Sequence, residues 1–101
     1  MPHNLKITKA KGKSKSEYIK ELELEGYSTY DWTDNPGAYY SPHSHEHDEC
    51  ICVVNGKTTF IVNKKEYTLN EGEKLYLPAH TIHESKNKFD EKVTYLIGEK
   101  T

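Results

Sequence analysis

The chain has 101 residues, of which 34% are hydrophobic and 30% are charged, and its formal net charge is −2. This length suits one domain built around a single hydrophobic core and leaves no room for a second domain. All 14 basic residues are lysine. Because arginine is the residue that usually recognises phosphate and guanine through paired hydrogen bonds, this composition argues against a nucleic-acid-binding protein.

The sequence lacks the patterns that direct a protein into or across a membrane. No apolar run approaches the roughly 20 residues that a membrane span requires. The N-terminus also lacks the apolar core of a signal peptide. We therefore expect a cytoplasmic protein with no membrane partner.

The two cysteines, Cys50 and Cys52, are separated by one residue on an expected strand. This spacing puts their Cα atoms about 6.5 to 7 Å apart, at or past the limit for a disulfide. We expect both thiols to be reduced and buried. A metal site made by this pair is the alternative, but it would need a further thiol, which the chain lacks.

The N-terminal quarter of the chain predicts a polar arm followed by a short helix. Residues 1–13 are rich in lysine and show little apolar periodicity, so we assign them to an arm and residues 14–101 to the domain. Ser14 and Glu17 have the spacing of a capping box, which predicts a helix from there to about residue 25. Its apolar stripe should cover an open sheet edge or the end of a barrel. The stripe consists of Tyr18, Ile19 and Leu22.

From Tyr27 onward, the alternation of side chains has the period of a strand. Strands are expected at residues 27–33, 38–45, 49–54, 58–62, 66–69, 74–77, 81–85 and 93–97, with a turn at residues 34–37. Turns at intervals of about 8 to 12 residues indicate an all-β sandwich or barrel. Asn55 and Gly56 give the strongest hairpin signal, so we expect residues 49–54 and 58–62 to pair with each other.

A short stretch holds three of the six histidines, His43, His45 and His47, followed closely by Glu49. Because side chains alternate along a strand, His43 and His45 project to the same side and can bind one ion. Glu49 can return to the same centre if the chain bends at residues 46–48. Imidazole and carboxylate ligands suit Fe, Mn, Ni, Co, Cu and Zn alike, so we expect one divalent transition-metal ion of undetermined identity.

A further ligand must come from the segment that contains His80 and His83. At these two segments the chain resembles the cupins, in particular the small single-domain cupins. Their first motif is matched throughout by Gly37, His43, His45, Glu49 and Gly56. Their second motif is matched by Gly72, Pro78, His83 and Asn87, and departs at His80, which stands where the family usually has glycine.

This resemblance, which covers roughly residues 28–98, implies both a fold and a site. The implied fold is a double-stranded β-helix, or jelly-roll, barrel that commonly forms a homodimer. The implied ligands of the metal ion are His43, His45, Glu49 and His83. One or two coordination positions then remain open for water or a small-molecule ligand.

Several polar and aromatic residues have more than one interpretation. His47 points to solvent, supports a ligand, or replaces His45 at the ion. His80 is a surface turn residue, since histidine tolerates positive φ better than most residues, or an acid/base group at the pocket mouth. The histidines as a polar cluster without an ion are disfavoured, because burying them with a carboxylate needs a complete hydrogen-bond network. Candidates for the pocket lining are Tyr30, Trp32, Tyr40, Ile51, Phe60, Tyr76 and Leu77.

Two functions fit these features. The first is a metal-dependent enzyme acting on a small oxygen-rich molecule, as an oxygenase, isomerase, decarboxylase or lyase. The second is a binding or sensing module that holds a metal and a small ligand without turnover. No general base stands out; the weak candidates are His47, His80, Tyr40 and Glu84. A metal-independent sugar isomerase is disfavoured by the intact ligand set and by the absence of arginine.

Overall fold

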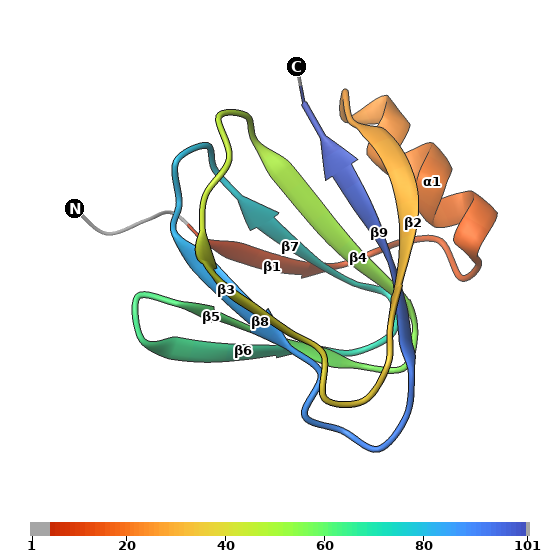
Figure 1. The fold of residues 1–101 in the computed structure, drawn as a ribbon. Helices are drawn as coiled ribbons and strands as arrows, with labels where there is room; N and C mark the ends of the chain where they lie inside the picture. The colour runs from red at the N-terminus through yellow and green to blue at the C-terminus, as the bar shows by residue number, and fades with distance from the viewer. Residues whose placement is uncertain (1–4, 101) are drawn as a thin grey trace.

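A computed structural model describes residues 5–100 as two antiparallel sheets and one helix (Figure 1). The elements are β1 (Lys6–Lys9), α1 (Lys15–Leu24), β2 (Ser28–Asp34), β3 (Tyr39–His43), β4 (Glu49–Asn55), β5 (Thr58–Val62), β6 (Lys65–Leu69), β7 (Glu73–Leu77), β8 (His83–Lys86) and β9 (Val93–Glu99). The five-stranded sheet has the order β1-β7-β4-β9-β2, and the four-stranded sheet has the order β3-β8-β5-β6. This arrangement is the expected jelly-roll barrel. No helix in residues 5–100 is long and apolar enough to cross a membrane.

The main core lies between the two sheets and draws on both. Its buried members are Ile51, Val53, Phe60, Val62, Leu69, Leu75, Leu77, Val93 and Tyr95. They come from alternate positions of strands whose other side chains face outward, as a two-layer β fold requires. This core fills the space between the two sheets.

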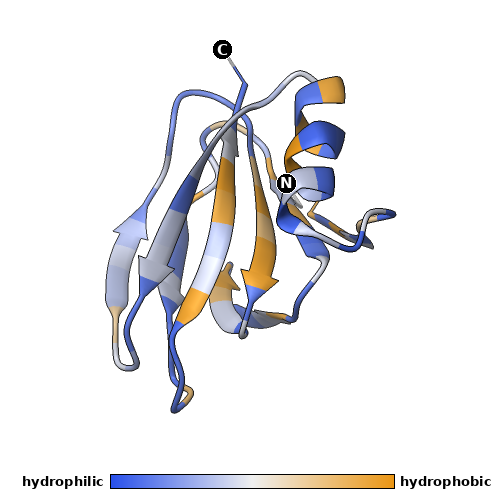
Figure 2. Cartoon of the chain, turned by 90° about the vertical axis from the view of Figure 1, so that its right-hand side faces the viewer, coloured by the Kyte–Doolittle hydropathy of each residue, from blue (hydrophilic) through white to orange (hydrophobic). Residues whose placement is uncertain are grey.

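The helix begins as its sequence predicts but covers a different surface. Ser14 is the N-cap, and its side chain accepts a hydrogen bond from the Glu17 backbone N–H at 3.3 Å. The helix packs on the outer face of the five-stranded sheet, not on an edge or a barrel end, and Figure 2 shows it beside strands that are largely orange. It buries a second cluster there, made of Tyr18, Leu22, Tyr27, Cys50, Cys52 and Leu96.

Both cysteines are free and buried beneath the helix, as expected. Burial raises the pKa of each thiol to about 12. Lys74, on β7, lies at the edge of this layer and forms ion pairs with Glu21 at 3.2 Å and Glu25 at 2.8 Å. These two ion pairs link the C-terminal half of α1 to β7 and stabilise the packing of the helix on the sheet.

The assigned arm contains a strand that the sequence analysis missed. Residues 6–9 pair antiparallel with β7, with Ile7 opposite Leu75. Lysines at both ends of such a short strand are typical of a sheet edge, where charge discourages further pairing. Four polar-rich residues are too few to show a strand period, which explains why the pattern gave no signal. Residues 1–4 of the arm lie outside the described residues.

The expected pairing of residues 49–54 with 58–62 is wrong. Asn55 ends β4 and the chain bends at Gly56, which has φ 88°, but β4 and β5 belong to different sheets. The bend therefore carries the chain across the core. The hairpin lies one strand later, between β5 and β6, where Asn63 and Lys64 both have positive φ. A two-residue motif predicts a tight turn, but burial of the flanking strands decides their partners.

Candidate metal centre

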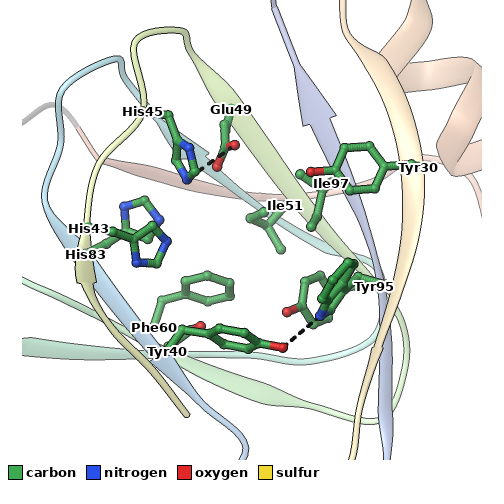
Figure 3. A pocket seen from close by; sticks show the side chains of 12 residues that line it. Tyr30, Tyr40, His43, His45, Glu49, Ile51, Phe60, His83, Tyr95 and Ile97 are labelled. Carbon is green, nitrogen blue, oxygen red and sulfur yellow. Dashed lines mark hydrogen bonds and ion pairs between the residues drawn. The ribbon is translucent and has the colours of Figure 1, made fainter. Parts of the chain in front are cut away.

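Three histidines converge on one side of a cavity between the two sheets (Figure 3). His43 ends β3 and His83 begins β8, and these two residues are directly opposite each other in the antiparallel pair. His45 follows β3 in the segment that bends at residues 46–47. One ring nitrogen from each histidine lies within 4.8 Å of the others. Three of the four expected ligands therefore face a common point.

The backbone around these histidines explains why they converge. The register between β3 and β8 shifts between Tyr40 and His43, which is the geometry of a β-bulge and turns His43 toward His83. The His80 backbone N–H donates a hydrogen bond to the His45 carbonyl at 2.7 Å. This bond holds the segment after β3 against the turn before β8.

Hydrogen bonds to carbonyl oxygens set the tautomers of two of the rings. His43 Nδ1 lies 2.6 Å from the Ser41 carbonyl oxygen, and His83 Nδ1 lies 2.9 Å from the Thr81 carbonyl oxygen. Because a carbonyl oxygen can only accept, each Nδ1 carries the proton and donates. Each Nε2 is then left with its lone pair, which is the form that binds a metal.

Electrostatics at the site favour a cation. Burial lowers the pKa of His45 and of His83, and the neighbouring histidines lower both further, so the rings are neutral near pH 7. Burial also raises the pKa of Glu49, which is only 4% exposed, and the nearby Glu99 raises it too. Neutral imidazoles beside a carboxylate that is costly to bury are the donor set expected for a divalent ion.

Glu49 joins the site from β4 and stands slightly apart from the three histidines. Its Oε2 atom lies 3.6 Å from His45 Nε2 and 3.7 Å from His47 Nε2. The ligand atoms of His45, His47 and Glu49 form a second group within 4.8 Å of one another. His45 is therefore common to the three-histidine group and to the group that contains Glu49. For His47, exposure to solvent, support of a ligand and replacement of His45 were all open; the structure leaves its side chain partly exposed and places its Nε2 atom beside Glu49.

The histidines occupy one end of a cavity of about 160 Å³. Its lining residues are Tyr30, Trp32, Tyr40, His43, His45, Glu49, Ile51, Phe60, His83, Ser85, Tyr95 and Ile97. Figure 3 shows the imidazoles and Glu49 on one side, Tyr40 and Tyr95 on another, and Ile51 between them. The cavity thus combines a metal-binding end with an aromatic end.

Some expected pocket residues lie elsewhere. Tyr76 is on the outer face of its strand, where its hydroxyl donates to Glu25 Oε1 at 2.6 Å beneath the helix. Leu77 is buried in the main core and does not line the cavity. His80 is exposed, with φ 64°, and borders a surface groove beside Ile82. These corrections follow from strand parity and from the bulge, which the sequence pattern does not reveal.

Asp34 organises the aromatic end, although the sequence predicts a turn at residues 34–37. It is the last residue of β2 and is only 5% exposed. Its carboxylate accepts hydrogen bonds from Trp32 Nε1 at 2.9 Å, from the Tyr40 hydroxyl at 2.7 Å and from the Tyr95 hydroxyl at 2.7 Å. Burial and the bond to Asp34 raise the pKa of Tyr95. Asp34 continues the alternation of Tyr30 and Trp32, which is the signal that would have found it.

The comparisons with known proteins agree with this geometry. A family model described as "Cupin domain" matches residues 30–98. A search of curated protein sequences finds no relative. The chain is similar in structure to a Cupin 2 conserved barrel domain protein from Salinispora arenicola, with 15% identity, a TM-score of 0.68, and coverage of 99% of this chain and 78% of that one.

Two similar structures have named activities. DMSP lyase DddQ from Ruegeria pomeroyi is 19% identical, with a TM-score of 0.68 and coverage of 75% of this chain and 39% of that one. The polyketide cyclase RemF from Streptomyces resistomycificus is 17% identical, with a TM-score of 0.67 and coverage of 72% and 53%. The chain therefore spans less than two thirds of both, and likeness at this identity shows the fold alone. Together with the match over most of its length, the histidine-lined barrel identifies the chain as a member of the cupin family.

Proposed function

We propose that this cupin binds one divalent transition-metal ion through His43, His45, Glu49 and His83, and holds a small oxygen-rich molecule beside it. The observation that carries the proposal is the convergence of three imidazoles at the end of a cavity, two of which donate a hydrogen bond from Nδ1 to a backbone carbonyl. A protein that leaves coordination positions open next to such a cavity can place a ligand on the ion.

The residues of the chain have separable roles in this proposal. The ion, when bound, supplies Lewis acidity or a site for oxygen chemistry. Phe60, Ile51 and Ile97 give the cavity apolar walls. Tyr40 and Tyr95 present hydroxyl oxygens whose protons are directed at Asp34. A metal-dependent oxygenase, isomerase, decarboxylase or lyase would fit; the similar lyase and cyclase structures support the choice of enzymes to screen.

The second candidate function is binding or sensing without turnover. This function is favoured because few of the expected general acid or base candidates lie in the cavity with a proton or lone pair free for catalysis. Glu84 accepts a hydrogen bond from the Tyr39 hydroxyl outside the cavity, and His80 is exposed on the surface. Only His47 and Tyr40 remain of the four expected candidates, and the Tyr40 proton is already donated to Asp34.

Elemental analysis tests the metal site first. The protein should be expressed without a histidine tag and purified without chelators or added metal. About one equivalent of a transition metal per chain supports the proposed site, whereas no metal, with none taken up on reconstitution, contradicts it. Incubating the loaded protein with candidate ligands in air then separates the two functions, because an enzyme turns its ligand over and a sensor binds it without change.

We also propose a cytoplasmic homodimer. Two buried free thiols suit a reducing compartment. Tyr39 and Ile82 are large side chains that are 54% and 63% exposed, and they lie at the β3 side of the four-stranded sheet. Covering such surface is a common reason for small β domains to pair. Sedimentation velocity would distinguish a dimer from an 11.7 kDa monomer.

A further inference from the structure

Three hydrogen-bond donors on the aromatic side of the cavity point at one carboxylate behind the cavity wall. The Trp32 indole N–H and the Tyr40 hydroxyl both donate to Asp34 Oδ1, at 2.9 Å and 2.7 Å. The Tyr95 hydroxyl donates to Asp34 Oδ2 at 2.7 Å. All three donors belong to side chains that line the cavity, on the side away from the imidazoles (Figure 3). We call Trp32, Tyr40 and Tyr95 the acceptor wall.

The bonds to Asp34 fix the polarity that the acceptor wall presents to a ligand. Burial and the bond to Asp34 raise the pKa of Tyr40 and of Tyr95, so both hydroxyls keep their protons. Because these protons are held by Asp34, the two hydroxyl oxygens can only accept a further hydrogen bond. The indole N–H is already shared between Asp34 and the Tyr40 oxygen, which lies 2.9 Å from it. A ligand group at this wall must therefore be a donor.

The charge behind the wall is not cancelled by its partners. Asp34 is only 5% exposed, and its three donors are all neutral groups, which solvate a carboxylate without neutralising it. No lysine is among the residues that line the cavity in the described part of the chain. The Tyr30 hydroxyl, on the same strand, likewise donates to a carboxylate, that of Glu99, at 3.1 Å. Aromatic rings backed by negative charge favour a cation over an anion.

We propose that the acceptor wall selects an ammonium group, so that the ligand of this cavity is a small zwitterion with an anionic end on the metal ion and an ammonium end at Tyr40 and Tyr95. The anionic end rests on the metal site proposed above; the ammonium end rests on Asp34 and the acceptor wall alone. A cavity of about 160 Å³ suits a small molecule, since a water takes about 30 Å³ of the liquid.

The competing explanation is a neutral ligand whose hydroxyl groups donate to the same two tyrosine oxygens. It satisfies the hydrogen bonds but gains nothing from the charge of Asp34. Ser85 does not choose between the two, because this lining hydroxyl can rotate to donate or to accept. A comparison at constant ligand length therefore separates the effect of charge from that of hydrogen bonding.

Binding of four matched carboxylates to the Zn²⁺-loaded chain tests the proposal. They are γ-aminobutyrate, γ-hydroxybutyrate, pentanoate and glutarate, which differ only in the group at the far end: ammonium, hydroxyl, methyl or carboxylate. Trp32 is the one tryptophan in the chain, so the NMR signal of its indole N–H reports binding at the acceptor wall. We expect γ-aminobutyrate to bind about tenfold more tightly than γ-hydroxybutyrate and pentanoate, and glutarate to bind most weakly. Shorter and longer members of each series locate the best length.

Variants assign the preference to Asp34. Asp34→Asn should remove the preference for the amine over the hydroxy acid, whereas Asp31→Asn, which removes a carboxylate paired with Lys15 on the exposed face of the same strand, should keep it. Because Asp34→Asn also destabilises the chain, Tyr40→Phe provides a second test, since it removes one acceptor oxygen and should weaken the preference. Circular dichroism checks that each variant is folded, and elemental analysis checks its zinc content.

The outcomes separate this inference from the proposed metal site. Zinc uptake with equal binding of the amine and the hydroxy acid, tighter binding of glutarate, or no binding of any of the four would overturn the inference and leave the metal site standing. A preference that Asp34→Asn and Tyr40→Phe both retain would overturn it as well. No zinc uptake would overturn the metal site; butylammonium against butanol on the metal-free chain then tests the acceptor wall, where a preference for the cation supports the inference and equal binding overturns it.

Discussion

His43 and His83 face each other across the β3–β8 pair, with ring centroids 4.3 Å apart. They come from the two separate histidine segments of the chain, so their juxtaposition is a property of the fold and not of local sequence. Each ring is oriented by a hydrogen bond to a carbonyl two residues before it. Removing either ring should therefore affect metal binding without disturbing the other.

His83→Ala should abolish most metal uptake at the three-histidine site. It should also remove the extra stability that the metal confers, because an ion bound only by the folded chain stabilises it by about 2.7 kcal/mol at a hundredfold excess over Kd. Thermal unfolding with and without added metal measures this difference. His80→Asn is the matched control: it keeps a side chain that tolerates φ 64° and lies outside the cavity. Equal loss of metal in both variants would contradict the ligand assignment.

Asp34→Asn should destabilise the chain by about 1 to 3 kcal/mol. The amide offers one acceptor where the carboxylate serves three donors, and the buried Tyr95 hydroxyl is left facing an N–H₂ group or without a partner. Urea unfolding measures the change. Asp31→Asn, on the exposed face of the same strand, should change stability little. Since Asp34 makes none of the contacts of the histidines, metal content should stay the same, and its loss would mean that the two ends of the cavity are coupled.

Lys74→Met should lower stability by about 1 to 3 kcal/mol at neutral pH, because Lys74 makes charge-assisted hydrogen bonds to Glu21 and Glu25. The effect should shrink in acid. Burial alone would raise the pKa of Glu21 and Glu25, but hydrogen bonds, including those from Lys74, outweigh it and lower both from the usual 4.5.

The sign of this pH dependence follows from proton linkage. The folded chain binds fewer protons than the unfolded chain at these two carboxylates, so their contribution is complete above the unfolded pKa and is lost as the pH falls through the folded values. Denaturant unfolding of both proteins at pH 7 and pH 3 tests this. If the difference in free energy of unfolding between the unchanged chain and Lys74→Met stays constant down to pH 3, the ion pairs are not its source. Lys20→Met, an exposed position on the same helix, is the control.

Comparing Gly56→Ala with Gly37→Ala should separate two destabilising effects: the clash of a new Cβ atom with its neighbours and the strain of a positive φ. Both glycines have nearly the same φ, 88° and 87°, so both substitutions impose the strain of a left-handed backbone, about 1 to 2 kcal/mol. A Cβ atom at Gly56 would lie 2.6 Å from the Lys92 carbonyl oxygen, whereas nothing lies within 4 Å at Gly37. Gly56→Ala should therefore lower the free energy of unfolding more than Gly37→Ala does. Equal urea midpoints for the two variants would show that the backbone at Lys92 shifts to make room for the new Cβ atom.

Much of this fold was predictable because its signals are local. The cap at Ser14, the left-handed turn at His80 and the strand at residues 58–62 depend on neighbouring residues, and the structure confirms each. The pairing of β4 was not predictable, since an Asn-Gly turn is compatible with either sheet. Strand alternation predicted that His43 and His45 share a face, and the resemblance to the cupins added His83 and Glu49 as ligands; the structure brings the three histidines together.

The remaining site residues could not be found from short-range patterns. Asp34 and Tyr95 meet only because β2 and β9 are neighbours in the five-stranded sheet, and Glu99 faces Glu49 only through the β4–β9 register. Tyr76 was misplaced because the face of a strand depends on its register with partners that the sequence does not name. Contacts between distant segments thus decide which residues meet at the aromatic end of the cavity and beside Glu49.

The position of His43 and His83 also bears on how the chain folds. Four strands, β4 to β7, lie between them in the sequence, so the chain must close this long loop before the two rings can meet. Closing long loops and pairing distant strands are slow steps in β-rich proteins. A metal ion added during refolding would therefore be captured only after the two sheets have assembled, and the rate of metal capture would report the last long-range step of folding.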